Sequence, residues 1–309
     1  MVLLAVALAA CSSSTATERT SETITRITAT TTTTTAPTTT TTTRPKAPPA
    51  QPRVPTDPAA LADTLVHDEQ ALRDPASTDA ALTAAARRQQ LTYRLLGNHP
   101  EWDAVVRPRV PAGLAHQVDL NIDARRAFVE MGQDYDPIDD LPPWTIVAPV
   151  PAAQLRAWYD EAAAASGVPW SYLAAINLVE TGFGRIVGPS SAGAQGPMQF
   201  IPSTWDVYGG GADIHDAHAS ILAAGRFLAA HGFAIDIEEA IFRYNNDHRY
   251  VRAVRDYAEL LAGEPGLLGS TYVRWEIYFH TRAGDVLLPV GYHAETTIPV
   301  GDWLATHPQ

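Results

Sequence analysis

The segment 170–180 most constrains the fold, because its apolar side chains point to nearly every side of a helix. Tyr172, Leu173 and Ile176 are spread around the helix rather than confined to one stripe. A helix of this kind is buried on most faces, since a surface helix needs only one apolar stripe. Gly182 follows closely and indicates where the helix ends. We therefore expect a mainly α protein in which this helix belongs to the core.

Helix start and stop signals recur before this segment. Residues that cap helices or open their first turn predict three helices, which end where glycine or the loss of periodicity stops them. The predicted helices run from Asp57-Pro58 to about Arg73, from Ser77 or Thr78 to Gly97, and between Pro111 and Met131. We interpret residues 57–135 as a helical hairpin or small bundle, followed by a proline-rich connector at 136–150.

The remaining chain divides into a helical part and a tail. Between residues 151 and 263 the caps predict helices at 151–165, 170–180, 217–231, 237–245 and 249–262. Residues 264–309 form a C-terminal extension, and its segments 272–280 and 286–293 are rich in β-branched and aromatic residues around Ala283-Gly284. This pattern predicts a short β-hairpin attached to the helical domain.

The N-terminus has a different character. Residues 1–10 are apolar, and Leu8-Ala9-Ala10-Cys11 resembles the lipobox of bacterial lipoproteins, which implies export and acylation of Cys11. The ten residues form a short signal without the usual basic start, so we expect a truncated signal or a misplaced start. Residues 11–56 are rich in Thr, Ser and Pro and cannot bury enough apolar surface to fold, which predicts a disordered tether.

Composition limits the classes of function. The formal net charge is −12, and the residues beyond the tether are acidic, whereas a nucleic-acid-binding protein needs a basic surface. Asp213, His215, Asp216 and His218 have no recognised metal-ligand spacing on one element, and we expect turn and cap residues there. No phosphate-binding loop is present. We expect a monomer without cofactor or metal.

Glu180 is the residue best placed for acid chemistry. It ends the apolar helix, where burial and the negative end of the helix dipole both raise the pKa of a carboxyl. A carboxyl that keeps its proton near neutral pH can protonate a glycosidic oxygen. A glutamate that simply reaches solvent from a helix end is the alternative, and the position of Glu180 alone favours that alternative.

The residues after Glu180 favour a catalytic role for Glu180 over a glutamate that reaches solvent. Three elements follow one another: Glu180-Thr181-Gly182-Phe183, the loop 190–202 (SSAGAQGPMQFIP), and Phe242-Arg243-Tyr244-Asn245. In this order they resemble the soluble lytic transglycosylase family of the lysozyme-like superfamily, over roughly residues 150–262. The resemblance implies a lysozyme-like catalytic domain that cleaves the glycan strands of peptidoglycan.

The resemblance also implies roles for single residues. Glu180 is then the single catalytic carboxylate, while Gln199 and Tyr244 line the cleft. A serine at position 190 or 191 hydrogen-bonds near the reaction centre, because the spacing to Glu180 is one residue longer than is common and leaves both open. Met198 fits the cleft wall or the core, and Asn245 fits either a binding role or a helix cap.

With one carboxylate, the expected reaction is intramolecular. Ordinary glycosidases use two carboxylates, and no second one belongs to the motif. In the family the C6 hydroxyl of N-acetylmuramic acid attacks C1 and leaves a 1,6-anhydro end. The alternatives are a muramidase that uses water at the same site, and a wall-binding lipoprotein without turnover. In each case we expect an extracytoplasmic protein held at the cell membrane by the lipid on Cys11.

Overall fold

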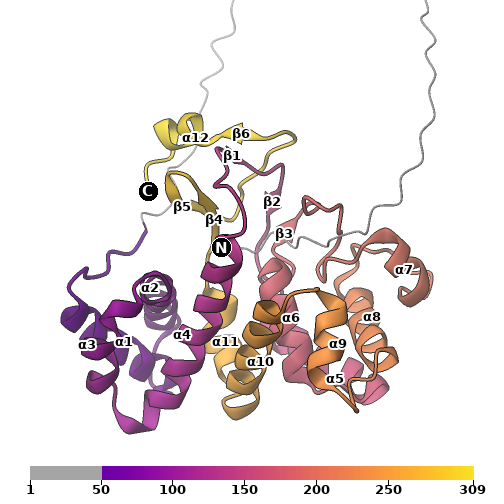
Figure 1. Ribbon diagram of the computed structural model, residues 1–309, viewed down its shortest axis with the longest axis horizontal. Coiled ribbons are helices and arrows are strands. Elements are labelled where there is room, and N and C mark those ends of the chain that lie inside the picture. Colours follow the sequence, from indigo (N-terminus) through magenta and orange to yellow (C-terminus); the bar gives the residue numbers. More distant parts are fainter. Residues whose placement is uncertain (1–50) are drawn as a thin grey trace, which may run out of the picture.

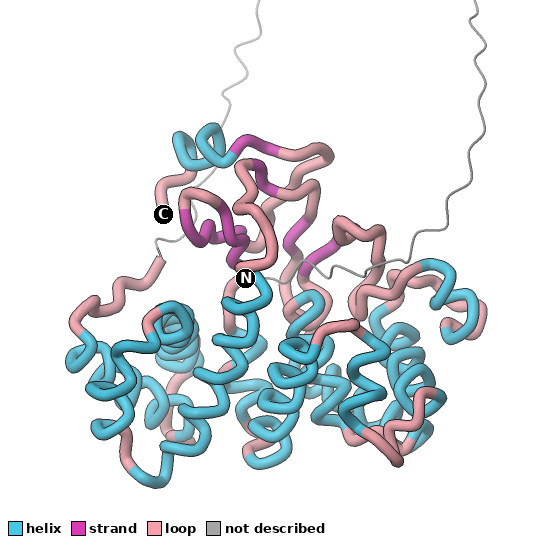
Figure 2. Tube along the Cα trace, viewed as in Figure 1, coloured by secondary structure: helices cyan, strands magenta, loops and turns pink. Residues whose placement is uncertain are grey.

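A computed structural model describes residues 51–309, and it is mainly helical, as predicted (Figure 1). The predicted signal at 1–10, the acylated Cys11 and nearly all of the tether lie outside the described residues. Figure 2 shows most helices gathered in the lower part of the view, with the short strands and α12 (Val300–Thr306) above them. The longer helices are α1 (Pro58–Arg73), α2 (Asp79–Asn98), α4 (Ala112–Gly132), α5 (Ala152–Ser166), α6 (Trp170–Thr181), α8 (Ala217–Ala230), α9 (Ile237–Tyr244) and α10 (His248–Gly263).

The predicted helix starts are confirmed by their caps. The Asp57 side chain accepts a hydrogen bond from the backbone of the first turn of α1, and Thr78 does the same for α2. The prediction that Gly97 stops α2 is wrong, because the helix continues through it. A Cβ at this position would lie 2.6 Å from Cγ of Arg125 on α4, so the glycine allows the two helices to pack closely.

The N-terminal helices share their hydrophobic core with the helices that follow. Residues such as Leu65 and Tyr93 belong to the same buried cluster as Leu173 and Ile176 of α6. Helix α10 lies between the two groups and packs against both α4 and α6. The segment 57–135 therefore helps to hold α6 in place from one side, through the shared core and through α10.

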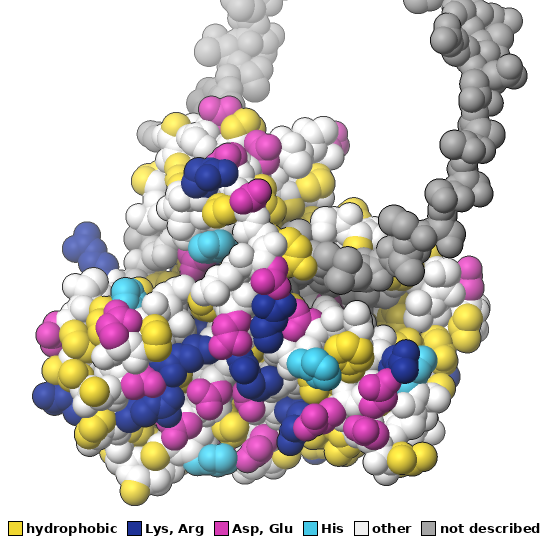
Figure 3. Space-filling model, in the orientation of Figure 1, with side chains coloured by type: hydrophobic (Ala, Val, Ile, Leu, Met, Phe, Trp, Pro, Cys, Tyr) yellow, Lys and Arg dark blue, Asp and Glu magenta, His cyan; other side chains and the backbone are white. Residues whose placement is uncertain are grey.

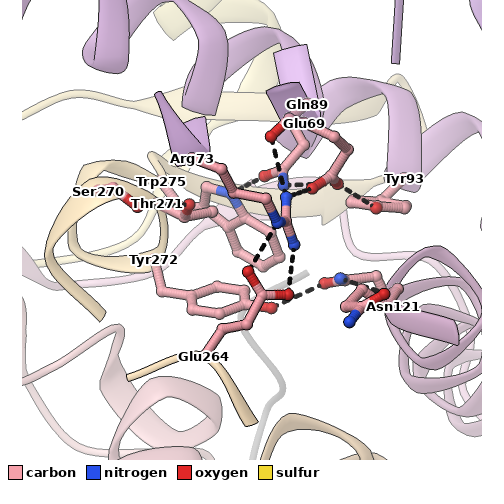
Figure 4. A network of polar contacts seen from close by, with 11 residues as sticks. Glu69, Arg73, Gln89, Tyr93, Asn121, Glu264, Ser270, Thr271, Tyr272 and Trp275 are labelled. Carbon is pink, nitrogen blue, oxygen red and sulfur yellow. Dashed lines mark hydrogen bonds and ion pairs between the residues drawn. The ribbon is translucent and has the colours of Figure 1, made fainter. Parts of the chain in front are cut away.

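A buried polar network also connects the N-terminal helices to the helices that follow (Figure 4). Glu69 on α1 is 1% exposed and accepts hydrogen bonds from Arg73, Gln89 and Tyr93. Arg73 also donates to Glu264, which follows α10, with Nε and Oε2 2.7 Å apart. Because the partners come from α1, α2 and the end of α10, the network links the first helices to the last long one.

Within residues 51–309, the strands form three small antiparallel pairs. β4 (Ile277–Thr281) and β5 (Gly284–Leu288) confirm the predicted hairpin, although Tyr272–Arg274 forms a short 3-10 helix instead of joining the strand. The segment 136–150 is more than a connector, since β1 (Asp140–Leu141) pairs with β6 (Ile298–Pro299). β2 (Thr145–Ile146) pairs with β3 (Ile186–Val187), which follows α6.

The short elements complete the description. Trp144 and Phe279 belong to a second apolar cluster beneath the strands, and α12 (Val300–Thr306) closes the chain. The remaining short helices are Pro100–Trp102, α3 (Asp103–Val106), Arg107–Arg109, α7 (Pro202–Tyr208) and α11 (Leu267–Ser270). Within residues 51–309, no helix combines the length and the apolar character needed to cross a membrane.

The Glu69 network yields a first test of the fold. Glu69→Gln keeps the size of the side chain but turns an NH₂ group toward buried donors, so we expect a loss of about 2–3 kcal/mol in the free energy of unfolding. Glu238→Gln is the matched control, because Glu238 is 59% exposed and its ion pair with Arg255 lies at the surface. The control should lose less than about 1 kcal/mol. Urea unfolding measures both, and equal losses would contradict a stabilising role for the network.

Candidate active site

The helix that carries Glu180 is buried as its composition predicts. Most residues of α6 are buried, and only Trp170, Tyr172 and Leu178 are partly exposed. The helix ends because Gly182 adopts a left-handed conformation with φ of 59°, and Phe183 follows with φ of 66°. Gly184 also has a positive φ, of 77°, so three successive residues with positive φ turn the chain away abruptly. Glu180 is thereby left on the last turn with only 4% of its surface exposed.

A tyrosine on the neighbouring helix holds the Glu180 carboxyl. The hydroxyl of Tyr250 on α10 donates a hydrogen bond of 2.6 Å to Oε1 of Glu180. Burial raises the pKa of Glu180 to about 8, and the hydrogen bond from Tyr250 offsets part of that rise. Burial also raises the pKa of Tyr250 well above 10, so the phenol remains a donor. Glu180 is therefore an uncharged acid at neutral pH.

The loop after β3 is fastened to the same helix. The carbonyl oxygen of Pro197 accepts hydrogen bonds from Asn177 Nδ2 at 2.8 Å and from Thr181 Oγ1 at 2.5 Å. Both donors lie on α6, one turn apart, and Tyr159 on α5 donates to Asn177 Oδ1 at 2.6 Å. The loop thus has a fixed position relative to Glu180, because its anchor and the acid share one helix.

Two backbone positions shape this loop further. Gly196 has φ of 73°, and a Cβ there would lie 2.0 Å from the carbonyl oxygen of Ile214, so only glycine fits. Gln199 also has a left-handed backbone, with φ of 50°. For a non-glycine residue this conformation costs about 1–2 kcal/mol, and such strain is often found at functional sites. Gln199 Nε2 donates to the carbonyl of Gly196 at 3.0 Å, which braces the turn.

A cavity of about 180 Å³ lies between the loop, α6 and α9. Glu180, Gln199, Tyr244 and Asn245 all line it, so the structure brings together four of the predicted site residues. The other lining residues are mostly apolar: Ala194, Phe200, Ile201, Thr204, Phe227 and Arg243. Among residues 51–309, Glu180 contributes the one carboxyl that lines this cavity.

Three predicted residues lie outside the cavity lining. Met198 is fully buried, and its backbone carbonyl accepts a hydrogen bond of 2.7 Å from the hydroxyl of Tyr244. Ser190 Oγ accepts hydrogen bonds from the backbone N–H groups of Ala192 and Ala194, at 3.2 and 3.0 Å. Ser191 is exposed. Of the two serines left open by the spacing, Ser190 is the buried one, and its oxygen closes the turn of the loop.

Tyr250 and Arg243 were missed by sequence reasoning. Tyr250 lies on the face of α10 that also buries Val254, Tyr257 and Leu261, and this periodicity was visible as a buried helix face. Its contact with Glu180 depends on how α10 packs against α6, which no local pattern states. Arg243 stands inside a quoted motif, and its exposed side chain pairs with Glu239 at 2.6 Å at the rim of the cavity.

The Asp and His residues near position 215 form local contacts. Asp216 caps α8 by accepting a hydrogen bond from the backbone of Ala219, at 2.7 Å, which confirms its predicted cap role. His215 contacts Asp213 at 3.0 Å, and His218 contacts Glu161 at 2.9 Å. In the described part of the chain, no group of three or more His, Cys, Asp or Glu residues is arranged to hold a metal ion.

Comparison of the chain with family models, curated proteins and solved structures finds no match. The site therefore has to be interpreted from its own geometry. In that geometry the protonated carboxyl of Glu180 accepts a hydrogen bond from the Tyr250 hydroxyl and lines a small cavity. The other walls of the cavity include amide and aromatic side chains.

The raised pKa of Glu180 predicts how stability depends on pH. Glu180 binds its proton more tightly in the folded state, so wild-type stability should fall as pH rises from about 4.5 to about 8. Glu180→Gln cannot ionise and keeps the size of the side chain. The variant should match the wild type below pH 4.5 and exceed it by on the order of 5 kcal/mol above pH 8, which is the free energy of a pKa rise from 4.5 to about 8.

Urea unfolding across this pH range measures the difference, with Glu259→Gln as the control because Glu259 is 60% exposed. A Glu180→Gln variant that is no more stable than the wild type at pH 8 would show that the carboxyl is ordinary.

Proposed function

We propose that this protein is a lytic transglycosylase that cleaves the β-1,4 bond between N-acetylmuramic acid and N-acetylglucosamine in peptidoglycan. The observation that carries the proposal is Glu180, a carboxyl that is 4% exposed, has a pKa of about 8 and lines a cavity beside Gln199 and Tyr244. The motif resemblance supplies the substrate class, and the geometry supplies an acid that is suited to the first step.

The first step is proton donation. At neutral pH the protonated Glu180 gives its proton to the glycosidic oxygen, and the bond between that oxygen and C1 of N-acetylmuramic acid breaks. The hydrogen bond from Tyr250 then stabilises the carboxylate that remains. A second carboxyl is lacking in the lining formed by residues 51–309, so the positive charge that develops at C1 is stabilised by the N-acetyl group of the substrate itself.

The second step returns the proton. The Glu180 carboxylate removes the proton of the C6 hydroxyl while the oxygen of that hydroxyl attacks C1. This step forms the 1,6-anhydro ring and regenerates the protonated Glu180. Apolar walls at Phe200, Ile201 and Phe227 support this outcome, because they disfavour an ordered water beside C1. No water is consumed, and the atoms of the substrate are all found in the two products.

The size and charge of the surface fit a polymeric substrate. The cavity of about 180 Å³ is smaller than the ~300–1,000 Å³ pockets that enclose whole ligands, so it takes only the reacting part of a strand. The face drawn in Figure 3 carries interspersed basic and acidic side chains. Substrate capture on such a surface depends on contacts along the strand rather than on long-range attraction.

The site of action follows from the N-terminal sequence. We propose that the protein is exported and anchored through an acylated Cys11, because Leu8-Ala9-Ala10-Cys11 resembles a lipobox. The Thr- and Pro-rich residues that follow then link the membrane to the catalytic helices.

Product analysis tests the proposal. Purified peptidoglycan digested with the protein should release muropeptides with 1,6-anhydro ends, which mass spectrometry distinguishes because they are lighter by one water than hydrolysis products. Glu180→Gln should lower the rate by at least about 10³-fold, since it removes the proton that both steps require. Activity should also fall above pH 8, where Glu180 ionises.

Glu259→Gln, at an exposed position on α10, should keep full activity. Hydrated ends would identify the muramidase alternative instead. Retention on cell walls without any release of fragments would identify the wall-binding alternative. Turnover by Glu180→Gln would contradict the assignment of the acid.

A further inference from the structure

A second cavity, of about 70 Å³, lies where α2, α4, α6, α10 and β4 meet. It does not include any residue of the proposed active site, but Leu178, Val179 and Gly182 line it from α6 and its cap. The remaining walls come from the N-terminal helices and the hairpin. The cavity is therefore located at the joint between the first helices and the helix that carries Glu180.

The polar walls of this cavity are dominated by arginine. Arg94 of α2, Arg125 of α4 and Arg185 after α6 line it, and each is less than a tenth exposed. Arginine keeps its charge in proteins, so three largely buried cations lie around one cavity. Burial without a compensating charge is costly, which makes the partners of each guanidinium informative.

Two of the three have partners. Arg94 forms an ion pair with Asp285 on β5, and Arg185 donates hydrogen bonds to the carbonyl oxygens of Gly182 and Trp275. Nη2 of Arg94 and Nε of Arg125 are both buried without a hydrogen-bond partner among the described residues, but Arg94 has the ion pair with Asp285, whereas no carboxylate in this part of the chain pairs with Arg125. Burial lowers the pKa of Arg125 to about 10, which still leaves the side chain charged at neutral pH.

Tyr278, which also lines the cavity, carries another unpartnered donor. The hydroxyl of Tyr278 on β4 is buried and has no hydrogen-bond partner in the part of the chain that the structure describes. Burial raises the pKa of Tyr278, so the phenol keeps its proton. Arg125 and Tyr278 are thus two donors, from α4 and β4, that line one cavity and share the lack of an acceptor.

The charges around the cavity do not balance. Arg87 pairs with Glu276 at 3.0 Å, and Glu276 also lines the cavity. Together with the Arg94 pair this makes two carboxylates for the four guanidiniums of Arg87, Arg94, Arg125 and Arg185. Water could accept from Arg125 and Tyr278, but it would not neutralise the excess charge.

From the unpartnered donors of Arg125 and Tyr278 and the excess positive charge, we infer that the cavity binds a small inorganic anion. A cavity of about 70 Å³ exceeds the ~10–15 Å³ that one water needs but leaves no room for a sugar or a peptide. A halide fits this space and accepts from Arg125 and Tyr278 at once. Since the walls come from α2, α4, α6, α10 and β4, the bound ion acts as a structural link behind Glu180.

Thermal unfolding of the protein tests this inference. Sodium chloride should raise the Tm by ~2–4 °C relative to sodium gluconate at the same ionic strength, because gluconate is too large for the cavity and screening is equal. Arg125→Met keeps the length of the side chain without its charge and should abolish the difference. Tyr278→Phe removes one donor and should reduce it.

Arg109→Met is the control, because the Arg109 side chain is 45% exposed and lies in another part of the chain. It should retain the full chloride effect. A wild-type Tm that is the same in chloride and gluconate would overturn the inference, and so would a chloride effect that persists in Arg125→Met.

A crystal of the wild type grown in sodium bromide gives a readout that does not depend on any variant. An anomalous peak within hydrogen-bonding distance of Arg125 and Tyr278 is the expected result. A cavity that holds only water at high bromide concentration would refute the site.

Discussion

The hydrogen bond from Tyr250 to Glu180 is the interaction on which the chemical interpretation depends. It joins α10 to the last turn of α6, over 2.6 Å, inside a region that water hardly reaches. Burial alone would favour a neutral carboxyl so strongly that the anion formed after proton donation would be unstable. The phenol offsets part of that cost, so one residue can act as an acid and then as a base. The rest of the fold supports this pair by fixing both helices.

The support comes from parts of the chain that are distant in sequence. Helix α10 packs between α4 and α6, and the Glu69 network connects α1 and α2 to the residues after α10. The loop after β3 is held to α6 by the hydrogen bonds to the Pro197 carbonyl oxygen. The cavity wall formed by this loop and the acid Glu180 are therefore both fixed to α6. The N-terminal helices therefore support α6 and α10 by packing, although these helices contribute no residue to the cavity lining.

Local features of the fold could be predicted from the sequence, and long-range ones could not. The caps at Asp57 and Asp216 depend on hydrogen bonds within a few residues, so their residue types suffice to place the helix starts. The burial of the helix that carries Glu180 followed from its apolar composition. The contact of Glu180 with Tyr250 could not be predicted, because the two residues are 70 positions apart and meet only through the packing of α6 against α10. The pairing of β1 with β6 was missed for the same reason.

The most direct test is the pKa of Glu180 itself, measured by ¹³C NMR of the side-chain carboxyl in protein labelled at glutamate and assigned by comparison with Glu180→Gln. The account predicts one carboxyl that titrates near pH 8. In Tyr250→Phe the same carboxyl should titrate at still higher pH, because the hydrogen bond that favours the anion is gone. A value near 4.5 in the wild type would mean that Glu180 is an ordinary ionised side chain at neutral pH, and it would contradict the role of Glu180 as the acid.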